Sequence, residues 1–294
     1  MKQLKEQQTL LLDGAMGTEL LRRGVDVSLP LWSARALGTD PEIVRKIHLE
    51  HLKAGADIIT TNTFRTTTRT FLKVIDDPAL AREKARAATS IAVDLIKKII
   101  GEGNTLISGS ISTLEDCYCP EFFPGIAVAE REFNEQAEWL VEAGIDLLLI
   151  ETMGRLDEAE AVLKVTKDFE ILRWVSFILK DSLHLYGGDS LSDAVKMCED
   201  KGAGAILVNC TNLETAVYAI ENINNITSLP LGVYPNLGKS MPSAEGEIEE
   251  TYSLHTFERW MKQALDLGVK IVGSCCGSTP EHTRILRNII DFLD

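Results

Sequence analysis

Three cysteines in this chain follow runs of apolar residues, at the points where buried strands would end. Cys210 follows AGAILVN, and the adjacent pair Cys275 and Cys276 follows VKIVGS. Three thiolates suit a borderline-soft cation such as Zn²⁺, and they leave one tetrahedral position open for a substrate. Gly273 and Gly277 flank the pair and would allow the sharp turn that it needs. We therefore predict that these cysteines bind Zn²⁺; the alternative is that they pack as small apolar residues.

Two carboxylates, like the three cysteines, follow runs of apolar residues. Asp13 follows TLLL, and Glu151 follows IDLLLI. A carboxylate at the end of such an apolar run either pairs with a cation or faces a solvated pocket. Together the two could bind a substrate ammonium group. The alternatives are that each pairs with an arginine or lysine of the scaffold, and that Asp13 caps a helix beginning near Thr18.

Short apolar runs recur along the chain and would carry these residues at their ends. The runs are apolar at consecutive positions, which is typical of strands buried on both faces of a parallel sheet. The eight runs are TLLLDGAMG from Thr9, ADIITTNTF from Ala56, TLISGSIST from Thr105, IDLLLIETMG from Ile145, WVSFILKD from Trp174, AGAILVNCTN from Ala203, LPLGVYPNLG from Leu229 and VKIVGSCCGS from Val269.

Amphipathic stretches fill most of the gaps between these runs. Residues 41–55 and 81–100, and segments starting at Arg131, Leu191 and Thr256, have helical spacing, and several end at glycine. This alternation predicts an α/β protein, a single (β/α)8 TIM barrel domain over residues 1–294. A doubly wound open sheet is the alternative, which the lack of a G-x-G-x-x-G fingerprint disfavours.

A barrel would gather the polar strand-end residues at one face, because active sites of such barrels lie at the carboxyl ends of the strands. The residues are Asp13, Asn62, Glu151, Asn209, Cys210, Asn236, Cys275 and Cys276. Two long loops, residues 110–125 and 236–251, would overhang the same face. Loops of this length are commonly lids or binding loops. The aromatic residues in and beside them could contact a methylated cation or simply pack the loops: Tyr118, Phe122, Phe123 and Tyr234.

The other three cysteines and one histidine are interpreted separately. Cys117 and Cys119 lie in the first long loop, either without a fixed role or near the metal. Cys198 is expected to pack within a helix. His282 follows Thr-Pro-Glu, a pattern typical of a helix start, and is expected on the surface rather than as a further ligand.

Composition narrows the class of protein. The chain has 30 Lys and Arg against 44 Asp and Glu, a net charge of −14, which disfavours nucleic-acid binding. No apolar run reaches the roughly 18 residues of a membrane span, and the start does not resemble a signal peptide. We therefore expect a cytoplasmic protein, in which the six cysteines do not form a disulfide framework. Both a monomer and a homo-oligomer are compatible with this composition.

The blocks DGAMGTEL, TNTF, ET after the fourth run, VNC and GSCCGSTPEH resemble the homocysteine S-methyltransferases. The resemblance implies a barrel in which Cys210, Cys275 and Cys276 hold zinc and homocysteine sulfur takes the fourth position. It also implies that the substrate is bound by Asp13, Gly14, Asn62 and Glu151. Gly-Ser-Cys-Cys replaces the family's usual Gly-Gly-Cys-Cys, and the first long loop departs from the S-methylmethionine enzymes, although VYPN at 233–236 resembles them.

The resemblance and the residues together predict an enzyme that transfers a methyl group to homocysteine and gives methionine. Zinc would keep the homocysteine sulfur anionic, and that sulfur would attack a methylated sulfonium or ammonium donor. S-methylmethionine and S-adenosylmethionine are the favoured donors; betaine, dimethylsulfoniopropionate and a different thiol or selenol acceptor stay open. A zinc-storing or thiol-sensing protein, and a metal-free lyase using Lys180 for a Schiff base, are the competing classes.

Overall fold

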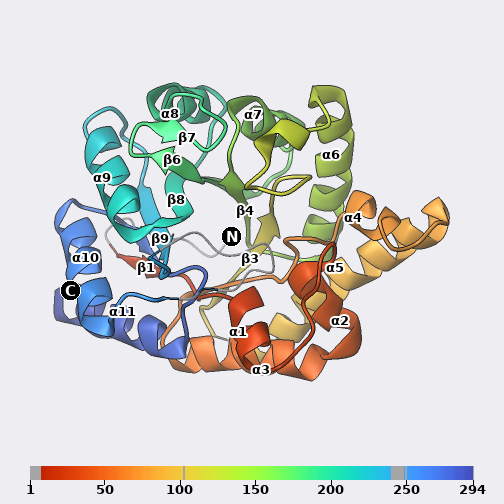
Figure 1. Ribbon diagram of the computed structural model, residues 1–294, viewed down its shortest axis with the longest axis horizontal. Coiled ribbons are helices and arrows are strands. Elements are labelled where there is room, and N and C mark those ends of the chain that lie inside the picture. The colour runs from red at the N-terminus through yellow and green to blue at the C-terminus, as the bar shows by residue number, and fades with distance from the viewer. Residues whose placement is uncertain (1–7, 102, 240–247, 249, 294) are drawn as a thin grey trace.

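The computed structural model describes residues 8–101, 103–239, 248 and 250–293, and it shows a parallel barrel enclosed by helices (Figure 1). Its eight strands lie in the order β1-β10-β9-β8-β5-β4-β3-β2. All neighbouring pairs in this sheet are parallel. The strands are β1 (Leu10–Leu11), β2 (Ile58–Thr60), β3 (Leu106–Ile111), β4 (Leu147–Met153), β5 (Leu172–Phe177), β8 (Ala205–Asn212), β9 (Leu231–Asn236) and β10 (Ile271–Val272).

The first and last strands of this order also meet, so the sheet closes on itself. A parallel bridge joins Leu12 to Ile58. Asp57 N donates to Leu11 O at 2.8 Å, and Asp13 N donates to Ile58 O at 3.0 Å. The predicted (β/α)8 TIM barrel is confirmed, and the open doubly wound sheet is excluded.

Helices connect successive strands and cover the outside of the barrel (Figure 1). Apolar side chains fill the space between sheet and helices, whereas a smaller set fills the barrel itself, including Leu149, Trp174 and Leu207. The helices are α1 (Gly17–Arg22), η1 (Trp32–Arg35), α2 (Ala36–Thr39), α3 (Pro41–Lys53), α4 (Thr68–Leu72), α5 (Pro78–Ile100), η2 (Pro120–Phe122), α6 (Ile126–Ala143), α7 (Leu156–Val165), α8 (Leu191–Asp200), α9 (Leu213–Ile223), α10 (Leu254–Asp266) and α11 (Pro280–Leu293).

Two details differ from the sequence expectation. Helix α5 begins at Pro78 rather than Ala81, because Asp77 accepts hydrogen bonds from the amides of Ala79 and Leu80 and so adds a first turn. The fifth apolar run divides into β5 and the short strand β6 (Leu179–Asp181), which pairs antiparallel with β7 (His184–Leu185). Lys180 therefore lies exposed on a hairpin instead of at the end of a barrel strand.

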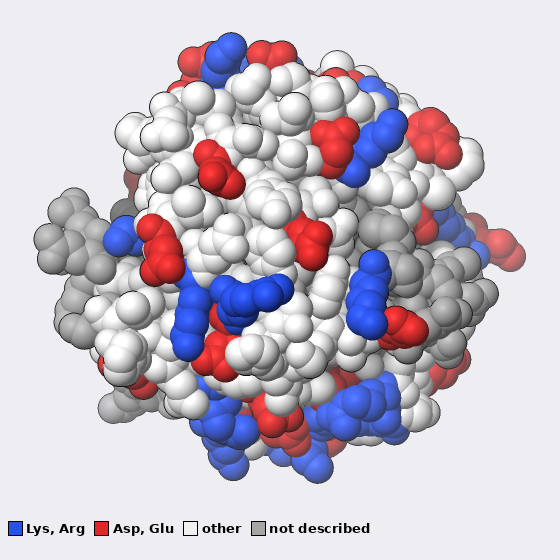
Figure 2. Space-filling view, turned by 60° about the vertical axis from the view of Figure 1, so that its left-hand side comes forward, with Lys and Arg blue, Asp and Glu red and all other residues white. Residues whose placement is uncertain are grey.

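Acidic and basic side chains are interspersed over the face shown in Figure 2 rather than gathered by sign. Across the described residues, no helix is long and apolar enough to cross a membrane.

Candidate metal and substrate site

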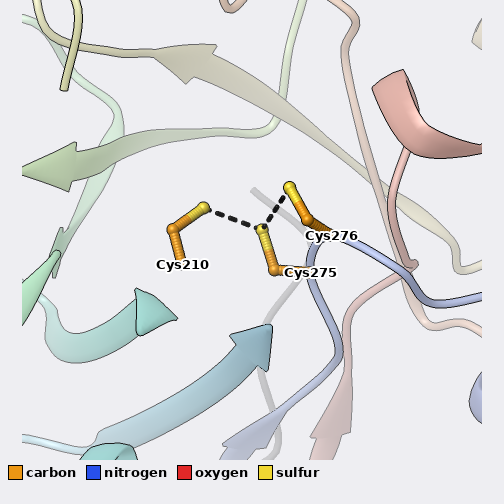
Figure 3. Close-up of side chains that lie close together, drawn as sticks. All are labelled: Cys210, Cys275 and Cys276. Carbon is orange, nitrogen blue, oxygen red and sulfur yellow. Dashed lines mark hydrogen bonds between the residues drawn. The ribbon is translucent and has the colours of Figure 1, made fainter. Parts of the chain in front are cut away.

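The three strand-end thiols meet at the carboxyl ends of the barrel strands (Figure 3). Cys210 lies in β8, and the other two follow β10. The Sγ atoms of Cys210 and Cys275 are 2.9 Å apart, those of Cys275 and Cys276 are 4.0 Å apart, and all three lie within 4.8 Å of one another. Three sulfurs at 2.3 Å from one tetrahedral Zn²⁺ would be about 3.8 Å apart. The donor type and spacing therefore fit a thiolate-bound metal after only small movements.

Cys210 takes an unusual backbone conformation. Its φ is +48°, in the left-handed region that non-glycine residues seldom adopt, at a bulge where β8 loses register with β9. Thr152 lies in a matching bulge of β4 with φ +62°. The Asn209 side chain joins the two, because its Oδ1 accepts from Thr152 N at 3.1 Å and its Nδ2 donates to Thr152 Oγ1 at 3.0 Å. Strained backbone of this kind is typical of functional sites.

The turn that carries Cys275 and Cys276 uses both flanking glycines. Gly277 has φ +84°, and a Cβ on Gly273 would lie 2.9 Å from the Cβ of Leu12. The first requires glycine for its conformation and the second for close approach.

Asn236, at the end of β9, links the two cysteine segments. Its Nδ2 donates to the Cys210 carbonyl at 3.0 Å, and its Oδ1 accepts from Cys276 N at 3.2 Å. The side chain is buried, so neither bond competes with bulk water. One amide thereby fixes the spacing of two strand ends that are distant in the sequence.

We expect Asn236→Ala to lower Zn²⁺ affinity roughly 10–100-fold, the usual range when a group that orients metal ligands is lost. Chelator competition at pH 7.5 would measure this. Asn224→Ala, which removes an exposed amide bonded to the Leu267 carbonyl, is the control and should leave affinity unchanged. Equal Zn²⁺ affinities for Asn236→Ala and the unaltered chain would contradict the linking role.

The three thiols influence one another's protonation. Hydrogen bonding to Cys210 and Cys275 lowers the pKa of Cys276 well below its usual range. The hydrogen bond with Cys275 holds the proton on Cys210 and raises the pKa of that thiol. These hydrogen bonds therefore favour the thiolate form at Cys276, and a bound cation would favour the thiolate form of all three.

Asp13 lies beside the thiols, on the strand-to-helix connection after β1. It is 7% exposed, and its Oδ2 accepts from Thr60 N at 3.1 Å. No arginine or lysine among the described residues pairs with it, and the nearest charged candidate is His48, with Nδ1 3.8 Å from Oδ2. The scaffold-pairing alternative is therefore wrong for Asp13. Capping is also wrong: helix α1 begins at Gly17, and its N-cap residue is Met16.

Gly14 lines a cavity that Asp13 and the three thiols also border. A Cβ at this position would lie 2.6 Å from His51 Cε1 and 2.8 Å from Ser278 Oγ, so a larger residue does not fit. Its amide donates no hydrogen bond to any described residue. An unpaired amide in a residue that lines a cavity is suited to a substrate carboxylate.

Glu151 is buried in the wall of the cavity. Burial raises its pKa to about 7, even though its oxygens accept hydrogen bonds from Ser110 Oγ and from Tyr234 Oη. No Arg or Lys among the described residues pairs with it. A carboxylate of this kind gains strongly from a substrate cation, because the cation offsets its lost hydration.

Asn62 also borders the cavity, but its amide is already engaged. Its Nδ2 donates to the Ser33 carbonyl at 2.8 Å, which ties the end of β2 to the segment before α2. Next to Ser33, Trp32 lies over Gly17, where a Cβ would be 2.5 Å from the indole nitrogen. The structure thus gives Asn62 a contact that supports the wall of the cavity.

The first long loop forms the opposite wall of the cavity, whose volume is about 460 Å³. Cys117, Tyr118 and Cys119 all line it, and Cys117 packs against Cys210 and Ile178. The predicted position of this loop over the thiols is therefore confirmed. Most of the second long loop, residues 240–247 and 249, lies outside the described residues.

Helix α7 anchors that first loop through a buried acid. Glu158 is 3% exposed, and its Oε1 accepts from Leu114 N at 2.9 Å. Burial raises the pKa of Glu158 from about 4.5 to about 7. The pKa of Glu158 is higher in the folded state than in the unfolded state, so protonation of this residue stabilises the fold. This stabilisation is complete below pH 4.5 and is lost as the pH rises through 7.

We expect the free energy of unfolding to fall between pH 6 and pH 8, with Glu158 contributing about 1 kcal/mol of that loss. Urea unfolding at the two pH values should show a smaller fall for Glu158→Gln than for the unaltered chain. Glu160→Gln, which removes a half-exposed acid of the same helix, should behave like the unaltered chain. Identical pH dependence in all three proteins would show that Glu158 does not titrate in this range.

Three residues lie in places other than those expected from the sequence, whereas Cys198 lies as expected. His282 is buried rather than exposed, with its ring 5.2 Å from that of Phe257 and its Nδ1 bonded to Thr279, because the amphipathic face of α11 turns its first turn inward. Phe122 is 64% exposed and Phe123 stacks under Arg155, so neither faces the cavity. Cys198 is buried in α8, as expected.

Sequence reasoning did not single out several residues that line the cavity, among them Trp32, Phe64, Arg65, Asp116 and Tyr186. Phe64 is the last residue of the TNTF block and Arg65 directly follows it, so that block was the available signal. Tyr186 follows the unpredicted β6–β7 hairpin and packs edge-on against Tyr118 at 5.8 Å. No local pattern marks such residues.

The fold, with its cavity at the carboxyl ends of the strands, places the chain among the (β/α)8-barrel enzymes. The family model for homocysteine S-methyltransferase matches residues 10–290, and the chain belongs to this family. The predicted family and enzyme class are confirmed.

Individual relatives agree with this assignment. The homocysteine S-methyltransferase of Escherichia coli is 30% identical, covering 97% of this chain and 96% of that protein. The homocysteine S-methyltransferase YbgG of Bacillus subtilis is 30% identical over 93% and 91% of the two chains. The selenocysteine Se-methyltransferase of Brassica oleracea is 28% identical over 94% and 87%.

A solved structure is similar over nearly its whole length. The metallated form of the homocysteine methyltransferase MmuM from Escherichia coli has a TM-score of 0.83, with 29% identity and 97% coverage of both chains. Its oxidised form has a TM-score of 0.84. A metallated state in a relative with this fold agrees with the thiol cluster described here.

Proposed function

We propose that this protein methylates homocysteine, with Zn²⁺ held by Cys210, Cys275 and Cys276 and a sulfonium compound of the S-methylmethionine type as donor. The observation that carries the proposal is the convergence on one cavity of three thiols and two carboxylates that pair with no arginine or lysine of the described residues. A zinc-storing protein would need the thiols but not the carboxylates. The lyase alternative fails, because Lys180 is exposed on the hairpin and does not line the cavity.

In this proposal the barrel as a whole is the homocysteine-binding domain. Asp13 and Glu151 bind the substrate ammonium group, the Gly14 amide binds its carboxylate, and Asn62 borders the same pocket. When bound, Zn²⁺ would supply the positive charge that keeps a thiol deprotonated at neutral pH. The protein fixes homocysteine sulfur in line with the donor methyl, and the loop carrying Tyr118 excludes water, which strengthens the attraction between thiolate and sulfonium.

The chemistry balances without a covalent intermediate on the protein. A carbon–sulfur bond forms between the donor methyl and homocysteine sulfur, while the bond from that methyl to the donor sulfur breaks. Its electron pair stays on the departing sulfur, which becomes a neutral thioether. No group of the chain needs to act as a nucleophile.

A donor panel on the zinc-loaded protein tests the proposal. S-methylmethionine, S-adenosylmethionine, betaine and dimethylsulfoniopropionate are each supplied with homocysteine, and methionine is quantified together with bound zinc. We expect methionine with S-methylmethionine and one zinc per chain. Selenocysteine as acceptor is the second arm, prompted by the plant relative. The proposal would be contradicted if the metal-free protein turned over, or if betaine were the only donor of the panel that gave methionine.

A further inference from the structure

Arg65 is a buried arginine that lines the cavity, and it has no carboxylate partner in the part of the chain that the structure describes. It follows β2 and is 8% exposed. Its Nη1 donates to the Glu115 carbonyl at 2.9 Å, whereas its Nε is buried with no hydrogen-bond partner. No carboxylate of the described residues lies within ion-pair distance of it. Of the described residues that line the cavity, it alone is cationic.

The neighbouring acids do not neutralise Arg65. The Glu115 carboxylate is bound instead by Arg69, at 3.2 Å, and by Lys73. Asp116 accepts from the amide of Tyr118 at 2.9 Å and faces the same cavity. A guanidinium that is buried without a counterion is costly, and the cost falls when an anion arrives. The site is therefore prepared for an anionic ligand group.

Homocysteine already has partners elsewhere in the cavity. Its sulfur belongs with the three thiols, its ammonium group with Asp13 and Glu151, and its carboxylate with the Gly14 amide. Arg65 instead lies against the first long loop, held by the carbonyl of Glu115. The proposed arrangement of homocysteine thus leaves Arg65 for the second substrate, whose methyl group must reach the thiol cluster in the same cavity. We therefore assign the anionic group that would pair with Arg65 to that second substrate.

We propose that Arg65 and Asp116 select a methyl donor that is an α-amino acid carrying a sulfonium group. Arg65 binds the donor carboxylate through its planar fork, and Asp116 binds the donor ammonium group. The aromatic rings of Phe64, Tyr118 and Tyr186 line the cavity and pack in the cluster that holds Cys210 and Cys275, where they would contact the sulfonium. This deepens the proposed function and depends on it, because it assigns the donor side of the same cavity.

Donor discrimination tests the two residues separately. S-methylmethionine carries both charged groups, dimethylsulfoniopropionate carries only the carboxylate, and trimethylsulfonium carries neither. We expect Arg65→Met to lower kcat/KM for the two carboxylate donors on the order of 100-fold, with trimethylsulfonium almost unaffected. Asp116→Asn should reduce the preference for S-methylmethionine over dimethylsulfoniopropionate by roughly tenfold or more. The KM for homocysteine should stay the same in both variants.

Controls separate this role from a loss of structure. Arg65→Lys keeps the charge but loses the fork, and it should retain part of the preference for carboxylate donors. Arg69→Met loosens the same loop without touching the cavity and should leave donor discrimination unchanged. Bound zinc and the melting temperature are measured for every variant. Unchanged discrimination in Arg65→Met, or a raised KM for homocysteine in its place, would overturn the proposal.

Calorimetry distinguishes failure of this inference from failure of the proposed function. S-methylmethionine is titrated into the zinc-loaded protein, both unaltered and as Arg65→Met. Binding to the unaltered protein that weakens on the order of 100-fold in the variant supports the assignment even if no methionine forms. Equal binding to both proteins overturns it even if methionine does form.

Discussion

Cys210→Ala should lose both bound zinc and the formation of methionine. The three thiolates share an affinity for Zn²⁺ of roughly 10–16 kcal/mol if the site resembles other thiolate sites. Loss of one ligand removes about a third of this, some 4 kcal/mol, and so lowers affinity on the order of a thousandfold. Metal analysis after gel filtration and a coupled assay for methionine would measure the two effects in one preparation.

A matched cysteine controls for the loss of a buried thiol. Cys198 is fully buried in α8, away from the cavity, and Cys198→Ala should keep zinc and activity. Addition of excess Zn²⁺ should restore part of the activity to Cys210→Ala, since two thiolates remain. A Cys210→Ala protein that is active without metal would refute the role of the cluster.

Asp13→Asn should keep zinc but raise the KM for homocysteine roughly 10–150-fold, the value of a hydrogen bond between charged groups. Asp13 is buried and pairs with no arginine or lysine of the described residues, and only His48 Nδ1 lies 3.8 Å from its Oδ2. The proposed function therefore assigns the substrate ammonium group to it. The value of kcat should change less, because the ammonium group is bound alike before and during methyl transfer. Initial rates at varied homocysteine and saturating donor would separate the two constants.

Asp57 provides the comparison for that experiment. It also lies next to a barrel strand, but its Oδ2 accepts from Leu11 N and pairs with Arg287 at 2.7 Å, at the amino ends of the strands. Asp57→Asn should lower the melting temperature without changing the KM for homocysteine. An Asp13→Asn protein with an unchanged KM would remove Asp13 from the substrate site.

The barrel could be predicted from the sequence because its determinants are local. Consecutive apolar residues such as those before Glu151 specify a strand buried on both faces, and amphipathic stretches ending at glycine specify the crossover helices. The polar residue at the end of each run is then placed at one face of the barrel by chain order alone. Asp13, Glu151 and the three cysteines were found in this way.

The contacts among those side chains were decided only by the tertiary structure. Asn236 spans two cysteine segments, and Asn209 reaches Thr152 across two strand bulges, although nothing in the local sequence marks these pairs. His282 is buried because α10 packs over it. Arg65 has no counterion among the described residues, because the Glu115 carboxylate is bound by Arg69 and Lys73. Such relations depend on the order and bulges of the strands, so they join residues whose separation along the chain carries no signal.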